Sequence, residues 1–240
     1  MDTETVRIDK YLSSHGLCSR RAVEQFLKEN TVLIDRKRVL ESGERINMKA
    51  RVTVNDEAID TPTLVYFLLN KPMGIITTSS DEYGRQNVLS LIKTKERIFP
   101  VGRLDKDTHG LLLLTNDGEL TNLLIHPRYH IAKTYELLIE KYITPKQIEK
   151  IKKGITLDDG VTKPAEVTIV RQMADTSILH ITIHEGKKRQ IRRMCEKLEI
   201  ELIDLMRIQF GPLTLGELQA GKYRELTPEE VTLLKSLNQK

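Results

Sequence analysis

The stretch Gly102–Gly118 constrains the fold of this chain more than any other part of the sequence. Its first residue and Gly110 are glycines, which suit backbone that turns sharply or comes close to another group. Leu111–Leu114 is an uninterrupted apolar run of the length of a short buried strand, and Asn116-Asp117-Gly118 ends it with a turn signal. The pattern therefore predicts a loop that is held against a buried strand.

Two charged residues of this loop, Arg103 and Asp105, are candidates for chemistry, because a rigid scaffold can present loop side chains to a ligand. Surface loops also carry many Arg and Asp residues without a function, so position alone leaves both interpretations open. A glycosidase-like pair of Asp105 and Asp107 is disfavoured, since Lys106 lies between them and the motif holds no third carboxylate. The glycine spacing fits neither a dinucleotide-binding fingerprint nor a P-loop.

The full motif reads Gly-Arg-Leu-Asp-x-x-Thr-x-Gly-Leu-Leu-Leu-Leu-Thr-Asn-Asp-Gly, and it resembles the active-site motif of the RsuA/RluB/RluF family of ribosomal RNA pseudouridine synthases. The resemblance extends through Asn70–Ile75, Lys133–Tyr135 and His184–Met194, so it covers nearly the whole chain. It implies an enzyme, an isomerase that converts a specific uridine of ribosomal RNA to pseudouridine. The RluB and RluF types look most similar, which favours 23S over 16S rRNA as the substrate.

The resemblance also implies the site residues. Asp105 matches the catalytic carboxylate, Arg192 matches the cation that keeps it ionised, and Tyr135 matches the aromatic residue that stacks on uracil and assists removal of the C5 proton. The residues expected to bind substrate are Arg103, Leu104, Thr108, Ile191, Lys187, Lys188, Arg189, Arg20 and Arg21. Gly-Lys-Lys-Arg at residues 186–189 departs from the family's commoner forms, so the separate roles of its three cations stay open. The chemistry implies no cofactor and no metal.

Residues 1–60 have a pattern of their own. Apolar spacing predicts a short helix over Arg7–Ser14 and a second one that begins after the N-cap residue Ser19. Val32–Ile34 reads as a strand, and a basic turn follows it. The pattern resembles the RNA-binding module of ribosomal protein S-four. We expect a linker over residues 56–62 and a catalytic domain over residues 64–240.

The catalytic part mixes helix and strand signals without a regular βαβ period. Strands are predicted at 64–69, 75–78, 111–114, 133–139, 167–170 and 177–184, and helices at 119–125, from 145 to about 154, at 188–198 and after Thr227. This order favours an α+β fold with a mainly antiparallel mixed sheet. The family resemblance adds a central cleft.

Charge distribution supports a phosphate-rich partner. Between Arg7 and Arg51 there are eleven Lys or Arg residues against six Asp or Glu, and five of the seven residues in Lys187–Arg193 are basic. The chain lacks the basic start and apolar run of a signal peptide and any apolar stretch that could span a membrane, so we expect a cytoplasmic protein. Two distant cysteines indicate reduced thiols. We expect a monomer that binds ribosomal RNA; the rival hypothesis is a non-catalytic RNA-binding factor in ribosome assembly.

Overall fold

The computed structural model describes residues 5–79 and 84–237, so the polar start of the chain lies outside the described residues. The chain divides into two compact units. The first contains Met1–Val65 with the short segments Thr94–Arg97 and Asn116–Gly118, and the second contains the remainder. Each unit has its own cluster of buried apolar side chains, which allows each to be described by itself.

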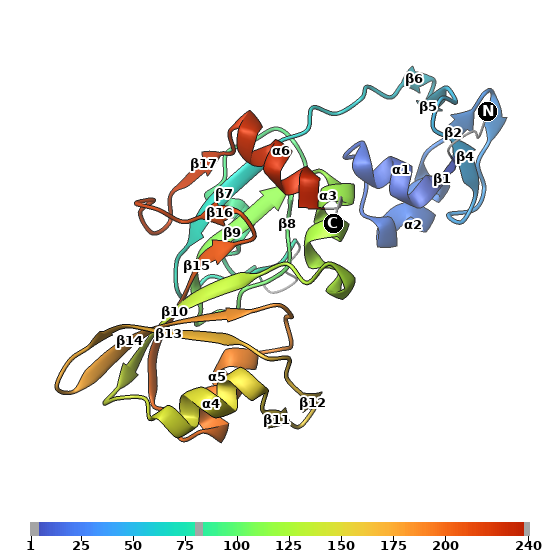
Figure 1. Ribbon diagram of the computed structural model, residues 1–240. Coiled ribbons are helices and arrows are strands. Elements are labelled where there is room, and N and C mark those ends of the chain that lie inside the picture. Colours follow the sequence, from blue (N-terminus) through green and yellow to red (C-terminus); the bar gives the residue numbers. More distant parts are fainter. Residues whose placement is uncertain (1–4, 80–83, 238–240) are drawn as a thin grey trace. The chain divides into compact units, whose positions relative to one another are not determined.

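The first unit packs two short helices against small antiparallel sheets (Figure 1). Its elements are β1 (Thr5–Arg7), α1 (Ile8–Ser14), the 3-10 turn η1 (Arg20–Ala22), α2 (Val23–Glu29), β2 (Val32–Ile34), β3 (Lys37–Arg38), β4 (Arg45–Asn47), β5 (Val52–Val54) and β6 (Glu57–Ala58). The predicted helices, the strand at Val32–Ile34 and the cap are confirmed, since the Ser19 hydroxyl accepts a hydrogen bond from the Ala22 amide. The predicted linker at 56–62 was too long, because β6 pairs with β5.

The second unit is built on a nine-stranded sheet in the main order β13-β14-β10-β15-β9-β7-β17. The strands are β7 (Tyr66–Lys71), β8 (Phe99–Pro100), β9 (His109–Thr115), β10 (Lys133–Glu140), β13 (Glu166–Gln172), β14 (Thr176–Ile183), β15 (Leu202–Phe210), β16 (Leu213–Thr214) and β17 (Tyr223–Glu225). A separate hairpin pairs β11 (Thr156–Leu157) with β12 (Gly160–Val161). Among the described residues of this sheet only β15 and β9 pair in parallel, so the prediction of an α+β fold with a mainly antiparallel sheet is confirmed.

Helices lie beside the two ends of this sheet (Figure 1). They are α3 (Gly118–Ile125) and α6 (Pro228–Ser236) beside β7 and β9, and α4 (Pro145–Lys153) and α5 (Gln190–Lys197) beside β13 and β14; the 3-10 turns are η2 (Val88–Leu91) and η3 (Pro127–Tyr129). Capping boxes begin α4 and α6, because Thr144 and Thr227 each exchange hydrogen bonds with the third helical residue. Strands β10 and β15 run between the two groups of helices.

One strand prediction was wrong, and one central strand was not predicted. Residues 75–78 contain only an isolated bridge between Ile76 and Asn87, and the preceding strand β7 instead continues to Lys71. Strand β15, one of the central strands, was not predicted. Its pattern mixes exposed Ile203 with buried Leu205 and Arg207, so it lacks the clean apolar alternation that marks a half-buried strand.

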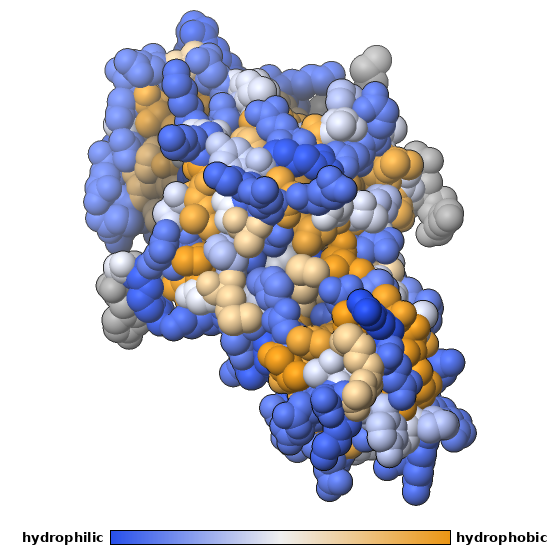
Figure 2. All heavy atoms as spheres, turned by 90° about the vertical axis from the view of Figure 1, so that its left-hand side faces the viewer, coloured by the Kyte–Doolittle hydropathy of each residue, from blue (hydrophilic) through white to orange (hydrophobic). Residues whose placement is uncertain are grey.

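The face of the molecule in Figure 2 is mostly hydrophilic, and hydrophobic residues are scattered over it, with one group in its lower part. Ile169 and Val170 on the edge strand β13 are 41% and 49% exposed.

Within residues 5–79 and 84–237, no helix combines the length and the apolar character that a membrane crossing needs.

Candidate active site

The loop between β8 and β9 carries Asp105. Val101 at its start donates a backbone hydrogen bond to Leu113 on β9, and the Thr108 amide donates to the Asp105 carbonyl, which closes a tight turn. Asp105 is half-buried, and its carboxylate has no hydrogen-bond or ion-pair partner among the described residues. The turn therefore presents a free carboxylate, and the predicted loop against a buried strand is confirmed.

Lys71 fixes this turn by hydrogen bonds to its backbone carbonyl groups. Its side chain is fully buried at the end of β7, and Nζ donates to the backbone carbonyls of Pro72, Asp105 and Thr108 at 3.2, 3.1 and 2.8 Å. Burial lowers the pKa of Lys71 to about 8, while the nearby carboxylates of Asp105 and Asp107 act in the opposite direction. Lys71 belongs to the Asn70–Ile75 motif, but no role was predicted for it. The one sequence feature that could have indicated a role is a lysine at the end of an apolar strand.

A row of four residues crosses the sheet beneath the loop. Tyr135 on β10 lies opposite Arg207 on β15, Arg207 lies opposite Gly110 on β9, and Gly110 lies opposite Lys71 on β7. Tyr135 and Arg207 are 9% and 2% exposed. The row brings Tyr135 into the same part of the sheet as the turn that carries Asp105, although the two residues belong to different elements.

Gly110 makes this row possible. Its φ of +100° is a conformation that L side chains rarely adopt, and a Cβ atom there would lie 2.3 Å from the Arg207 carbonyl oxygen. The sequence predicts that the backbone at Gly110 comes close to another group, and that group is the backbone of β15 at Arg207.

Two arginines of the α5 end reach the same loop through Asp107. Arg189 Nη1 lies 3.0 Å from both carboxylate oxygens of Asp107, and Arg192 Nη2 donates to the Asp107 carbonyl at 2.7 Å. Arg192 Nε lies 3.4 Å from Asp107 Oδ2. Partial burial works against the charge of Asp107, but the hydrogen bond from Arg189 and the charges of both guanidinium groups lower its pKa below the usual range.

This arrangement corrects one expectation. The resemblance implies that Arg192 accompanies Asp105, whereas the contacts that the described residues make place Arg192 on Asp107, two residues further along the loop. The physical reason is local: Asp107 offers both a carboxylate and a carbonyl oxygen to the guanidinium group, and Arg192 can contact both at once.

The other cations of this region differ in whether their side chains already have protein partners. Lys187 Nζ donates to the carbonyls of Asp159 and Gly160, both at 3.0 Å, so it is engaged in holding the hairpin between β11 and β12. Arg193 forms a bidentate ion pair with Asp159. Lys188 and Arg103 are exposed, and neither has a partner among the described residues.

The other residues expected to bind substrate fall into two groups. Leu104 and Ile191 are 5% and 4% exposed, and Thr108 is buried with a hydroxyl that has no partner in the described part of the chain. Arg20 and Arg21 are exposed in the first unit, where Arg20 forms an ion pair with Asp9 at 3.0 Å. The structure therefore gathers all of the predicted site residues except Arg20 and Arg21 in the second unit.

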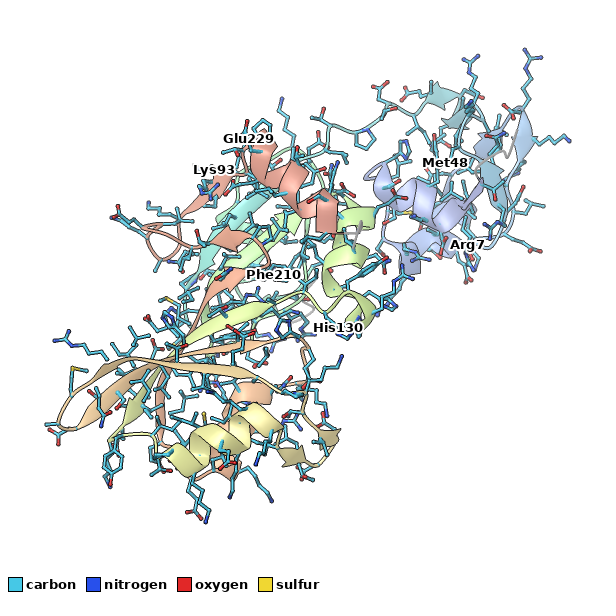
Figure 3. The ribbon with its side chains drawn as sticks, viewed as in Figure 1. Arg7, Met48, Lys93, His130, Phe210 and Glu229 are labelled. Carbon is cyan, nitrogen blue, oxygen red and sulfur yellow. The ribbon has the colours of Figure 1, made fainter. Side chains whose placement is uncertain are left out.

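Two further cations near Tyr135 were not assigned a role from the sequence. Lys133 and Arg207 both lie over the ring of Phe210, which is labelled within the second unit in Figure 3. Arg207 could not be found because β15 was not predicted. In the described ranges no group of three or more His, Cys, Asp or Glu residues is placed to hold a metal ion.

Comparisons with known proteins agree with this geometry. Residues 65–197 match the RNA pseudouridylate synthase family, and residues 6–57 match the S4 domain. The chain is 43% identical to "Ribosomal large subunit pseudouridine synthase B" of Bacillus subtilis over 96% of both chains. It is 35% identical to "Dual-specificity RNA pseudouridine synthase RluF" of Salmonella typhi, over 96% of this chain and 78% of that protein.

A solved structure shows the same fold along nearly the whole length. The crystal structure of a pseudouridylate synthase superposes with a TM-score of 0.70 at 28% identity, covering 95% of this chain and 99% of the other. Both the extent of the match and the identity with the Bacillus subtilis protein bear out the resemblance found in the loop motif. The chain belongs to the RNA pseudouridylate synthase family and carries an S4 domain ahead of the catalytic part.

Proposed function

We propose that this protein converts a specific uridine of ribosomal RNA to pseudouridine, and that the uridine lies in 23S rRNA. The observation that carries the proposal is the free, half-buried carboxylate of Asp105 on a turn fixed by Lys71. The choice of RNA is supported by the relative from Bacillus subtilis, which is named for the large ribosomal subunit and matches this chain from end to end.

The reaction breaks the bond between ribose C1′ and uracil N1, turns the base and joins C1′ to C5. The proton on C5 leaves and N1 gains one, so the change is an isomerisation that needs no redox partner. In this proposal Asp105 acts on the sugar, and Tyr135 stacks on uracil and assists loss of the C5 proton. Arg192 would act through its contacts with Asp107, which help to fix the loop that presents Asp105.

The target base must leave its stack before Asp105 can reach the sugar, at a cost of a few kcal/mol. We assign the offsetting contacts to exposed cations: Arg103 and Lys188 in the second unit and Arg21 in the first, together with Arg20, which also forms an ion pair with Asp9. Leu104, Thr108 and Ile191 would form the apolar surroundings of the base. Lys187 and Arg189 would act mainly by fixing the loop and hairpin that they contact.

This assignment gives the two parts of the chain different tasks. Residues 1–60 would bind RNA, and residues 64–240 would carry the reaction. The protein would act in the cytoplasm as a monomer and without a cofactor. Size-exclusion chromatography with light scattering measures the oligomeric state directly.

The central test uses ribosomal RNA labelled with tritium at uridine C5. Purified protein should release tritium from 23S rRNA, and chemical mapping should show one new pseudouridine there. Release that still requires a divalent ion, once RNA refolding has been controlled for, would contradict the cofactor-free reaction.

A second candidate substrate is 16S rRNA, since the loop motif from Gly102 to Gly118 also resembles that of RsuA, the 16S enzyme of the family. Mapping both ribosomal RNAs from cells with and without this protein distinguishes the substrates. Loss of a single 16S position with 23S unchanged would overturn the choice of subunit. A protein that binds ribosomal RNA tightly but releases no tritium would instead be a non-catalytic assembly factor.

A further inference from the structure

A buried cation, Arg207, and a half-buried one, Lys133, lie near the same ring in the second unit without a carboxylate partner in the described part of the chain. Arg207 is 2% exposed; its Nε donates to the Leu111 carbonyl at 2.7 Å, and its buried Nη2 has no hydrogen-bond partner. Lys133 is half-buried, and Nζ donates to the Ile131 carbonyl at 3.0 Å. An ammonium group has three donors, so two of those on Lys133 are unassigned within the described residues.

The same ring supports both cations. Lys133 Nζ lies 5.6 Å and Arg207 Cζ 5.0 Å from the centre of the Phe210 ring. Cation–π attraction and the two carbonyl contacts offset part of the desolvation cost, but two like charges this close also repel each other. Burial and the charge of Arg207 together lower the pKa of Lys133 to about 8. An anion at this place would relieve both costs.

The pair lies next to the proposed catalytic residues. Lys133 and Tyr135 are two residues apart on β10, so their side chains leave the same face of the strand with Cα atoms roughly 6.6 Å apart. Arg207 lies directly opposite Tyr135. Lys133, which is the less buried of the two cations, is the one that a ligand can reach.

We propose that Lys133 binds a phosphate of the target nucleotide, with Arg207 behind it adding positive charge. The proposal rests on the proposed function, because it places the uracil of the same nucleotide at Tyr135. A nucleotide carries its base and its phosphates on different sides of the ribose, which suits a base at Tyr135, a sugar at Asp105 and a phosphate at Lys133. The bound phosphate would hold the extruded nucleotide by its backbone, independent of the flanking sequence.

The test pairs a protein change with an RNA change. A hairpin of 23S rRNA that contains the mapped uridine is made with an uncharged methylphosphonate at one phosphate at a time, next to that uridine. Dissociation constants and single-turnover rates are measured for the wild-type protein and for Lys133→Met. At one phosphate, the methylphosphonate should weaken wild-type binding about tenfold, the worth of one charge-assisted hydrogen bond. With Lys133→Met the same replacement should cost less than about twofold, because the partner is already lost.

Three controls make the result specific. Lys133→Arg keeps the charge and should keep the methylphosphonate penalty. Lys150→Met removes an exposed lysine on α4 and should leave the penalty as in the wild type. Thermal unfolding of each variant identifies any that fails to fold, and Lys133→Gln replaces Lys133→Met in that case.

The outcomes separate this proposal from the proposed function. Equal penalties in wild type and Lys133→Met at every phosphate, with normal pseudouridine formation, would overturn the phosphate site alone. A wild-type protein that modifies neither ribosomal RNA would overturn both. As a second measure, the slope of log Kd against log salt should become shallower by about 0.7 in Lys133→Met, as expected for one lost phosphate contact on a single strand.

Discussion

Arg207 on β15 lies directly opposite Gly110 on β9, and their backbones approach so closely that any Cβ atom on Gly110 would overlap the Arg207 peptide. This contact joins the strand behind the catalytic loop to the strand that carries a buried cation. The parallel pair β9–β15 has only two pairs of facing residues, His109 with Met206 and Gly110 with Arg207. A substitution at Gly110 or Arg207 should therefore shift the strand positions of the whole row from Tyr135 to Lys71.

Gly110→Ala should destabilise the protein by about 3 kcal/mol, because the added methyl group is strained at positive φ and meets backbone atoms that cannot move aside. Urea unfolding followed by circular dichroism measures the change. Gly186→Ala is the matched control, since no atom lies within 4 Å of a Cβ atom there. Equal stability of the two variants would show that the β9–β15 contact can relax.

Asp105→Asn should reduce pseudouridine formation by more than about 10³-fold, because the amide can neither attack nor stabilise charge on the sugar. RNA affinity should stay within about twofold, since many phosphate contacts dominate binding. Tritium release and filter binding measure the two quantities. Asp175→Asn, on an exposed turn, should leave both unchanged; retained turnover in Asp105→Asn would refute the catalytic assignment.

The pH dependence of stability should report the buried position of Lys133. Its pKa is lowered to about 8, so between about pH 8 and 10.5 the unfolded state binds more protons than the native state, and wild-type stability gains with rising pH. The stability of wild type relative to Lys133→Met should thus increase by about 2 kcal/mol from pH 7 to pH 10. The difference between Lys133→Met and Lys133→Arg should stay constant, because neither side chain titrates there. A pH-independent difference between wild type and Lys133→Met would contradict the shift.

Cys195 should resist alkylation in the native protein. It is 3% exposed, and burial raises its pKa to about 12, so the reactive thiolate is scarce at pH 8. Iodoacetamide labelling followed by peptide mass spectrometry should show Cys195 reacting about 100-fold slower in the native state than in urea. Rapid native labelling would mean that α5 opens locally.

The sequence was sufficient for the local features of this fold. The helix that begins at Pro145, the helix after Thr227 and the strand over Leu111–Leu114 all depend on neighbouring residues, and the structure has each of them. The family motif located the loop with Asp105 in the same way. These features follow from short-range physics or from a contiguous pattern.

The parts that could not be predicted depend on pairings between distant segments. Strand β15 is recognisable only once β9 and β10 are known to flank it, and the role of Arg207 depends on that position. The partner of Arg192 was wrong for a related reason, since a motif match cannot distinguish Asp105 from Asp107 when both lie on one short loop. The contacts of Lys71 with the Asp105 and Thr108 carbonyls could not be predicted either, because every residue has a backbone carbonyl and the sequence does not show which ones a lysine will reach.

The place of β15 in the sheet also sets when the enzyme can first work during its synthesis. Asp105, Tyr135 and Arg192 all precede Leu202, yet β15 is the strand that joins β10 to β9. A nascent chain that has emerged only to residue 200 therefore holds all three side chains but lacks the strand that joins β10 and β14 to β9 and β7. Any premature stop before β15 should yield an inactive product, and activity on ribosomal RNA should begin only when Leu202–Phe210 has left the ribosome.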